Sequence, residues 1–327
     1  MLDIYFDLEY GKLCELVDHG SFDAFVLNTE YGTVKNMFIK RPAPYLIDGI
    51  QYYDIVTPYG YGGPIMVEAT DKKKLLQLYH EVFAKYCEDN HIVCEFIRYH
   101  PIYRNYEDFG AVYQTVYSRH TVGTNLKDYE NPMQSEFSKT ARREVRKAES
   151  AGVTCTINLH PDNLDVFRKL YEETMDRNHA NEMYYFPDEY YKILTTTLKD
   201  SVLEIQAQYD GETVASEIYF IAGGLMHAHL LGNNHKLLDV GGGVILEAAA
   251  AKWGKDNGYE YIHHGGGRSS AEDDPLYKYK KKFGKNTEFD FYMGKKIWNQ
   301  EVYDRLVALR EAEGEITNTE YFPKYRG

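Results

Sequence analysis

A run of lysines near the end of the chain holds the first candidate residues for chemistry. The segment Asp273–Lys285 reads DDPLYKYKKKFGK, and helical spacing puts Leu276, Tyr279 and Phe283 on one apolar face. Most of the lysines fall on the opposite face, but Lys280 borders the apolar stripe. The spacing therefore predicts that Lys280 points into a cleft while its neighbours attract a polyanion, with an ordinary solvated face as the alternative.

A glycine turn precedes another predicted helix. The segment Leu238–Val244 reads LDVGGGV, and Gly241, Gly242 and Gly243 would leave backbone N–H groups and a positive helix end free to hold a phosphate or a carboxylate. The turn lacks the P-loop lysine and the Rossmann glycine spacing, which argues against an ATPase or a dinucleotide enzyme. A flexible turn with close helix packing is the alternative.

A second glycine run follows a predicted strand and includes His264, Gly265, Gly266 and Gly267. Three glycines permit a close approach of backbone to ligand, so we expect this run to form the floor of a cleft. Two further histidines, His227 and His229, lie on one predicted strand. Without an acidic ligand at useful spacing they favour a hydrogen-bonded hairpin core over a metal site.

The first part of the chain has its own candidate loop, Thr57–Pro64 (TPYGYGGP). Its prolines fix φ and its glycines allow tight turns around Tyr59 and Tyr61, which favours a binding loop over an ordinary linker, although a turn wrapping a sheet has the same composition. At the end of a nearby predicted strand, Arg98 and His100 pair a fixed cation with a group that titrates near neutrality.

These candidates need strands and helices to position them, and the hydrophobic patterns predict both types throughout the chain. The first part alternates short β-branched or aromatic runs with one amphipathic helix. Its predicted strands are Ala24–Asn28, Thr33–Ile39, Tyr52–Val56, Ile92–Arg98 and Val112–Thr121, and its predicted helix is Asp71–Cys87.

From Pro132 a similar mixture begins again, with hairpin turns at Asp210-Gly211 and Gly223-Gly224. The order of elements predicts a mixed α/β fold. The expected helices are Ser138–Ser150, which is very basic, Leu164–Met175, Val244–Asn257 and Glu301–Glu311, and the expected strands are Val153–Asn158, Val202–Tyr209, Thr213–Ala222, Leu225–Leu231 and Tyr259–His263.

Composition limits the classes of protein that fit. The 327 residues favour two domains, and 43% hydrophobic with 27% charged residues is a globular balance. Acids outnumber bases 50 to 37, giving a net charge of −13, which argues against a protein held on nucleic acid mainly by a basic surface but allows a local basic patch. The 31 tyrosines suit wet binding surfaces.

The cysteines and the hydropathy indicate a compartment. Cys14, Cys87, Cys94 and Cys155 are scattered without a CxxC motif, and the acidic start MLDIYFDLEY does not resemble a signal peptide. No window approaches the roughly 18 to 20 apolar residues of a membrane span. We therefore expect a reduced, cytoplasmic protein without a membrane span.

Taken together, these motifs resemble the FemABX-like family of aminoacyltransferases over nearly the whole chain. The motifs that carry the resemblance, in order, are Phe6–Gly11 (FDLEYG), Thr57–Pro64, Arg142–Gly152 (RREVRKAESAG), Phe167–Tyr171 with Thr174-Met175 and Arg177-Asn178, His264–Gly267, and Leu276–Phe283 (LYKYKKKF). The resemblance implies an α/β (α+β) fold made of two tandem acyltransferase modules of the GNAT type, with mixed, mostly antiparallel sheets.

The same resemblance implies an activity: transfer of an aminoacyl group from aminoacyl-tRNA to an amine of a peptidoglycan precursor or similar cell-envelope acceptor, with no metal or redox cofactor. It implies that Lys280 faces the acyl donor, where an ammonium group stabilises an oxyanion or the departing tRNA hydroxyl, and that Tyr279 is the aromatic residue before it. It implies an acceptor-phosphate contact for Arg177, next to Asn178. His100 stands where the family often has an acid.

The expected modules are residues 1–130 on the acceptor side, 131–297 on the donor side, and a final segment 298–327 whose packing on the first module stays open. Two other functions remain. An acyl-CoA-dependent N-acyltransferase acting on an amino sugar or amino acid would hold the CoA pyrophosphate at Gly241–Gly243, whereas a non-catalytic protein would bind an envelope precursor without turnover. The oligomeric state is left open.

Overall fold

The computed structural model describes residues 2–327, which form two compact units. Unit 1 contains residues 2–9 and Arg119–Asp290, and unit 2 contains Tyr10–Ser118 and Phe291–Gly327. Strands β6 (Gln114–Asn125) and β12 (Glu288–Ile297) carry the chain from one unit to the other. The units thus divide at 118/119 and 290/291. The boundaries expected from the sequence, 130/131 and 297/298, lie farther along the chain. Residues 298–327 pack within unit 2.

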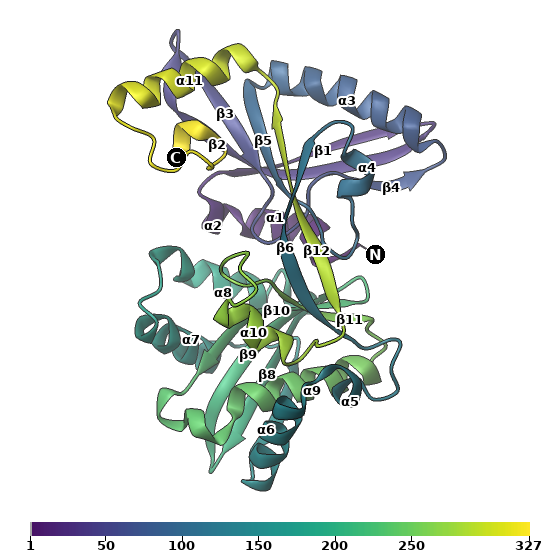
Figure 1. Cartoon of the computed structure of the whole chain (residues 1–327), viewed down its shortest axis with the longest axis vertical. Helices are drawn as coiled ribbons and strands as arrows, with labels where there is room; N and C mark the ends of the chain where they lie inside the picture. The colour runs from purple at the N-terminus through teal and green to yellow at the C-terminus, as the bar shows by residue number, and fades with distance from the viewer. Residues whose placement is uncertain (1) are drawn as a thin grey trace. The chain divides into compact units, whose positions relative to one another are not determined.

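Unit 2 is built on a sheet in the order β1-β2-β3-β5-β12, with β4 also paired to β2 (Figure 1). The other strands of this sheet are β1 (Ser21–Thr29), β2 (Gly32–Ile47), β3 (Ile50–Val56), β4 (Ile65–Ala69) and β5 (Ile92–Arg98). Its helices are α1 (Leu8–Leu13, shared with unit 1), α2 (Glu15–Asp18), α3 (Lys72–Asp89), α4 (Tyr106–Phe109), α11 (Gln300–Glu313) and the short η5 (Lys324–Arg326).

The long helices of unit 2 each pack onto an apolar cluster. Helix α3 buries Leu75, Tyr79, Phe83 and Cys87, whose spacing of three to four residues forms one helical stripe. Helix α11 buries Val302, Tyr303 and Leu306 in a second cluster with Val93 and Cys94 of β5. The final segment is therefore part of the core of this unit.

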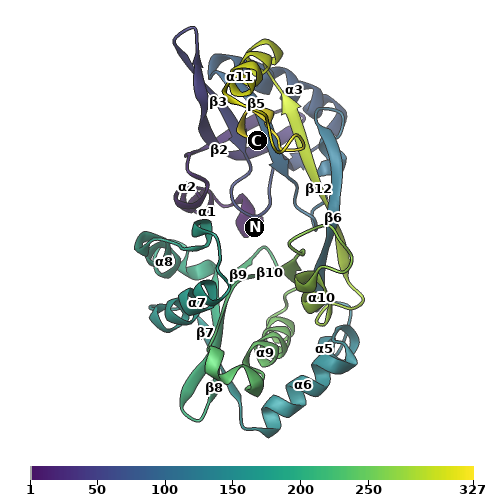
Figure 2. The same ribbon diagram turned by 60° about the vertical axis from the view of Figure 1, so that its left-hand side comes forward.

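Unit 1 has a sheet in the order β6-β11-β10-β9-β8-β7. Figure 2 shows α7 and α8 on one side of its strands and α9 with α5 and α6 on the other. The strands are β7 (Thr154–Leu159), β8 (Val202–Tyr209), β9 (Glu212–Ala222), β10 (Leu225–Asn233) and β11 (Tyr261–Gly265); the helices are η1 (Ile4–Phe6), α5 (Pro132–Glu136), α6 (Lys139–Ser150), α7 (Asp165–Arg177), η2 (Glu182–Tyr184), α8 (Asp188–Thr195), η3 (Lys199–Ser201), η4 (His235–Val240), α9 (Gly242–Asp256) and α10 (Pro275–Lys281).

The two units share a plan. Within each unit one strand pair is parallel, β3 with β5 in unit 2 and β10 with β11 in unit 1, while the other pairs are antiparallel. A parallel pair needs a crossover connection, and helices α3 and α9 supply it. The prediction of mixed, mostly antiparallel sheets in two modules is confirmed.

Most predicted elements are present, with informative shifts. The Lys-rich helix is shorter than expected, because Asp274 caps its start and the structure leaves the helix at Lys281. Strand β11 begins at Tyr261 rather than Tyr259, since the Tyr259 and Glu260 amides bond the carbonyls of Gly254 and Gly224. Strands β4 and β12 and helix α8 were not predicted. None of the described helices is long and apolar enough to cross a membrane.

Candidate active site

The glycine turn of unit 1 leads directly into α9. Gly241 adopts a left-handed backbone with φ +82°, and no side chain caps the helix. The amides of Val244 and Ile245 bond the carbonyl of Gly241, whereas within residues 2–327 the amides of Gly242 and Gly243 have no backbone partner. These two N–H groups and the positive helix end form a site that suits an anion.

Strands β10 and β11 are paired over only part of their length. They pair only from Leu225–Tyr261 to His227–His263, and β10 then has a register shift between Ala228 and Leu230. The strand ends therefore diverge where β11 runs into Gly265, Gly266 and Gly267.

The second glycine run connects β11 to α10. A Cβ at Gly267 would lie 2.6 Å from Asp274 Oδ1, so glycine is needed for the close approach of the capping residue. Asp274 accepts hydrogen bonds from the amides of Leu276, Tyr277 and Ser269 at 2.9–3.0 Å. These bonds, first that of Tyr277, lower the pKa of Asp274 to about 2. The cap fixes the start of the helix that carries Lys280.

Lys280 lies partly buried on α10, and its Nζ donates a hydrogen bond to the carbonyl of Gly266 at 2.8 Å. Burial lowers its pKa to about 8, although the nearby carboxyl groups of Glu247, Glu217 and Asp274 favour the charged form. This bond holds the ammonium of Lys280 against the backbone of the predicted cleft floor, and the expected role of Lys280 toward an acyl donor stays a prediction.

Two buried acids that sequence reasoning missed lie near Lys280. Glu217 on β9 accepts a 2.6 Å hydrogen bond from the hydroxyl of Tyr219. Burial raises the pKa of Glu217 to about 7, while the Tyr219 bond and the charge of Lys280 oppose the shift. The second acid, Glu247 on α9, is also buried, and burial together with the charge of Glu217 raises its pKa well above the usual range.

Glu247 faces His264. The hydrogen-bond partners of His264 indicate which of its ring nitrogens carries the proton. The hydroxyl of Thr124 donates to the carbonyl of Phe283 at 2.8 Å, so it accepts from His264 Nε2, also at 2.8 Å. Burial and the charge of Lys280 lower the pKa of His264 to about 3, which leaves a lone pair on Nδ1. This atom lies 3.5 Å from Glu247 Oε2, so the neutral, protonated carboxyl of Glu247 is the form that fits.

The other residues predicted in unit 1 lie on separate elements. Tyr279 packs edge-on against Phe283, and its hydroxyl would be 3.4 Å from a Cβ at Gly243, so it lies close to the glycine turn. Arg177 ends α7 and Asn178 caps it, both exposed. Helix α7 is tied to the end of β10, because Thr174 Oγ1 accepts a hydrogen bond from the Asn233 amide at 2.9 Å.

In unit 2, Arg98 holds the loop Thr57–Pro64 in shape. Its guanidinium donates to the carbonyls of Thr57 and Gly60, and its amide donates to Thr57 Oγ1 at 3.0 Å. The half-buried Tyr59 receives a hydrogen bond at its carbonyl from the hydroxyl of Tyr10, at 2.8 Å. The loop is therefore fixed rather than a mobile linker, and Arg98 supports it through backbone contacts.

His100 is fully buried beside the same loop. Its ring lies 6.3 Å from that of Tyr61, and its Nδ1 accepts the amide of Tyr103 at 3.1 Å. Because Nδ1 is engaged, a role as a base would require Nε2.

The remaining histidines form hydrogen bonds in unit 1. His227 Nε2 lies 2.8 Å from Asp3 Oδ2, and His229 Nε2 lies 2.5 Å from the hydroxyl of Tyr190. The expected hydrogen-bonded role holds for both, but the acid beside His227 comes from the far N-terminus, which spacing along the strand did not reveal.

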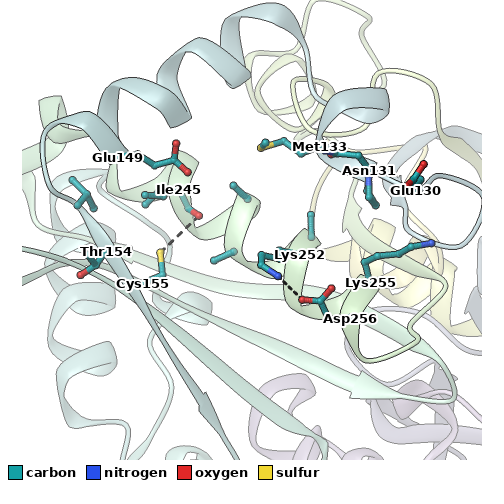
Figure 3. A pocket seen from close by; sticks show the side chains of 15 residues that line it. Glu130, Asn131, Met133, Glu149, Thr154, Cys155, Ile245, Lys252, Lys255 and Asp256 are labelled. Atoms are coloured by element: carbon teal, nitrogen blue, oxygen red, sulfur yellow. Dashed lines mark hydrogen bonds and ion pairs between the residues drawn. The ribbon is translucent and has the colours of Figure 1, made fainter.

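A cavity of about 560 Å³ lies elsewhere in unit 1, between α5, α6, β7 and α9 (Figure 3). Apolar side chains such as Met133 and Ile245 line it, with charged groups such as Glu149 and Lys252 at its edges. It contains none of the predicted site residues, so the candidate active site is defined by the glycine turns and Lys280.

Comparisons with known proteins agree with this geometry. Residues 135–281 match the family model described as an acetyltransferase (GNAT) domain. This stretch includes α9, β11, α10 and Lys280. The match lies within unit 1. No curated protein matches the sequence.

Solved structures extend the likeness to nearly the whole chain. FemX is 13% identical, with a TM-score of 0.68 over 91% of this chain and 92% of its own. The C-terminal domain of a protein named as a lysylphosphatidylglycerol synthetase from Agrobacterium fabrum is 15% identical, with a TM-score of 0.57 and coverages of 95% and 93%. L-PGS from Bacillus licheniformis is 15% identical, with a TM-score of 0.55 and coverages of 96% and 99%. The expected FemX-like fold is confirmed.

Proposed function

We propose that the protein transfers an aminoacyl group from aminoacyl-tRNA to an amine of a peptidoglycan precursor or a related cell-envelope acceptor. The FemX fold and the GNAT domain support acyl transfer. The name of one further structural neighbour, a lysylphosphatidylglycerol synthetase, joins an aminoacyl group, lysyl, to a phospholipid. The observation that carries the proposal is the placement of Lys280, partly buried and bonded to Gly266, on a helix whose Tyr279 hydroxyl lies close to the uncapped start of α9.

The proposed reaction is direct. The acceptor amine attacks the carbonyl carbon of the aminoacyl ester, a C–N bond forms, and the bond to the tRNA hydroxyl oxygen breaks. The amine loses a proton and the departing hydroxyl oxygen gains one. The ammonium group of Lys280 stabilises the negative charge on the carbonyl oxygen or on that departing oxygen. No covalent enzyme intermediate, metal or redox cofactor takes part.

The other candidate residues receive supporting roles. Arg177 and Asn178 would bind a phosphate of the acceptor, and Tyr59 and Tyr61 would contact its apolar surfaces. Arg98 would act by positioning the loop that carries these tyrosines. His100 would serve as a hydrogen-bond partner, or as a base through Nε2.

We place the reaction in the cytoplasm. All four cysteines are free, and three of them are buried, as expected for a protein in a reducing compartment.

An acyl-CoA-dependent N-acyltransferase acting on an amino sugar or amino acid is the second candidate. The unpartnered amides of Gly242 and Gly243 favour it, since they suit a pyrophosphate as well as another anion. A non-catalytic precursor-binding protein would share the fold and bind without turnover.

The first experiment measures transfer and thermal stabilisation with aminoacyl-tRNA, acetyl-CoA and a UDP-linked muropeptide. Product from aminoacyl-tRNA is expected, and Lys280→Ala should lower turnover ~100- to 1,000-fold with little change in the KM for the acceptor, because it removes a charge that acts in the transition state. Lys252→Ala, on the exposed side of α9, is the control and should leave turnover intact. Turnover with acetyl-CoA alone would select the second candidate.

A further inference from the structure

Helix α6 carries a dense stripe of positive charge. Five cations lie within nine residues: Lys139, Arg142, Arg143, Arg146 and Lys147. Four of them are exposed and Arg142 is half-buried. The apolar side of the helix, Ala141, Val145 and Ala148, is buried in the core of unit 1, so the cations occupy the outer side.

This charge is not neutralised within the chain. None of the five cations forms an ion pair with any residue from 2 to 327, and the acid between them, Glu144, instead lies 3.4 Å from Lys282 of the segment after α10. The protein has a net charge of −13 and pairs many of its other surface lysines and arginines with acids. An unpaired basic stripe on such a protein is a local electrostatic attractor for a polyanion.

The basic stripe of α6 also lines a groove. A groove of about 410 Å³ is lined by Gln134, Lys139, Thr140, Arg142, Arg143 and Arg146. The Arg142 guanidinium is fixed in it, because Nη1 donates to the carbonyls of Gln134 and Phe137 at 2.6 and 3.1 Å. Its other donors remain available for a phosphate, which matches the planar fork of arginine.

The groove adjoins the proposed donor site. The amide of Ser138, which caps α6, donates to the carbonyl of Lys282 at 2.7 Å, so the helix starts at the end of the Lys280 helix. Farther along, Ala148 Cβ lies 3.3 Å from the position of a Cβ at Gly241. Helix α6 therefore runs beside both parts of that site within unit 1.

We propose that the α6 groove binds the phosphodiester backbone of the RNA that carries the acyl group; the proposal rests on the proposed function. Twelve helical residues span about 18 Å, which exceeds the reach of one pyrophosphate and suits several phosphates in a row. The helix has no aromatic side chain for base stacking, so binding is independent of RNA sequence. It also exposes no apolar residue for insertion into a lipid surface, which favours RNA over a membrane.

The test is a titration of uncharged tRNA against the full-length protein at several salt concentrations. The variant Lys139→Gln/Arg143→Gln/Arg146→Gln should bind tRNA at least ~10-fold more weakly at low salt and lower the slope of log K against log salt by about 2 to 3, because three phosphate contacts are lost. The control Lys72→Gln/Lys73→Gln/Lys74→Gln on α3 removes the same charge and should bind like the unmodified protein.

Three results would overturn the proposal: equal tRNA binding by the groove variant and the control, a loss confined to CoA binding, or a loss confined to binding of vesicles that contain anionic phosphatidylglycerol. An aminoacyl ester of a dinucleotide is too short to reach along α6, so it distinguishes the proposed aminoacyl transfer from RNA binding by the α6 groove. The groove variant should transfer the aminoacyl group from this ester as fast as the unmodified protein does, whereas Lys280→Ala should not. If no form of the protein transfers an aminoacyl group, the proposed function fails, and the tRNA titration still decides the role of the groove.

Discussion

Lys280 is the residue on which the proposed chemistry depends, and its charge is set by burial and by three carboxyl groups from different elements. Glu217 comes from β9, Glu247 from α9 and Asp274 from the turn before α10. Burial favours the neutral amine and lowers the pKa to about 8, and the carboxyl groups favour the ammonium to the extent that they are ionised. The group is thus charged at neutral pH but loses its charge within an accessible range.

This balance predicts a pH dependence. Above pH 8 the ammonium of Lys280 is lost, whereas the guanidinium in Lys280→Arg stays charged. We expect the ratio of turnover in Lys280→Arg to that in the unmodified protein to rise up to ~10-fold per pH unit above 8. Taking a ratio cancels the titration of the acceptor amine. A ratio that stays flat from pH 7 to 10 would show that Lys280 does not act as a cation.

Glu247 gives a prediction about stability. Its pKa is raised by burial, so the folded state retains a proton that the unfolded state loses above pH 4.5, and this group makes the protein less stable as the pH rises from that value. Glu247→Gln removes the titration, and its amide can donate to His264 Nδ1. The free energy of unfolding of the variant, relative to that of the unmodified protein, should increase between pH 5 and 8 in denaturant titrations.

Glu247→Ala is the contrasting variant. It also removes the titration but leaves a cavity where the buried carboxyl lay 3.5 Å from His264 Nδ1, so it should be less stable than Glu247→Gln at every pH. Identical pH profiles for the unmodified protein and Glu247→Gln would contradict the proton assignment.

The burial of Glu217 and Glu247 could not be predicted from the sequence. Lys280 could be selected as a candidate because it borders an apolar stripe, but that spacing does not specify its hydrogen bond to Gly266. Glu217 and Glu247 are each the one acid in an apolar run, SEIYF and LEAAAA. An acid in such a run can be buried or can face solvent. Its burial is decided by the packing of β9 against α9, which the sequence pattern does not specify.

At the scale of elements, the two crossover helices differ at their starts. Asp71 caps α3 by accepting the amide of Lys74 at 3.1 Å, whereas α9 begins with glycines and has no side-chain cap. A capped helix start has its amides satisfied by its own side chain, and an uncapped one can receive a ligand. This difference supports the assignment of the donor to unit 1.

Gly243→Ala tests that assignment. The new Cβ would lie 3.3 Å from Asn233 Oδ1 and 3.4 Å from the Tyr279 hydroxyl, and so would crowd the helix start. Alanine favours helix over glycine by about 1 kcal/mol, so the variant should fold. We expect a higher KM for the donor with an unchanged KM for the acceptor. Gly110→Ala, which has space around it in unit 2, is the control; an unchanged donor KM in Gly243→Ala would remove the donor from this turn.

Strand β12 shows why some elements escaped prediction. Its sequence, EFDFYMGKKI, contains a central glycine and two consecutive lysines, which weaken a strand pattern. In the structure Gly294 is needed, because a Cβ there would lie 2.8 Å from the ring of Tyr99. The strand is stabilised by pairing with β5, about 200 positions earlier in the chain, and such a long-range contact leaves no local signal.

At the scale of the whole molecule, the last 37 residues belong to a unit built largely from the first third of the chain. Leu306 of α11 is fully buried against β5. Leu306→Ala should destabilise unit 2 by about 2 to 5 kcal/mol. Hydrogen exchange should then lose protection in β3 and β5 but keep it in β8 and β9. The exposed Leu309 provides the control, since Leu309→Ala should change neither; equal loss in both units would mean that they unfold as one.

The discontinuous units also fix an order of events at the ribosome. Residues 10–118 leave the ribosome before most of unit 1, but their sheet lacks β12 until the chain has passed residue 297. By then every segment of unit 1 has been synthesised. Unit 2, most of which is synthesised before most of unit 1, is therefore completed last, and its strand β5 has no β12 partner during the synthesis of more than half of the protein. A nascent chain halted near residue 290 would present that unpaired strand edge to chaperones and to other nascent chains.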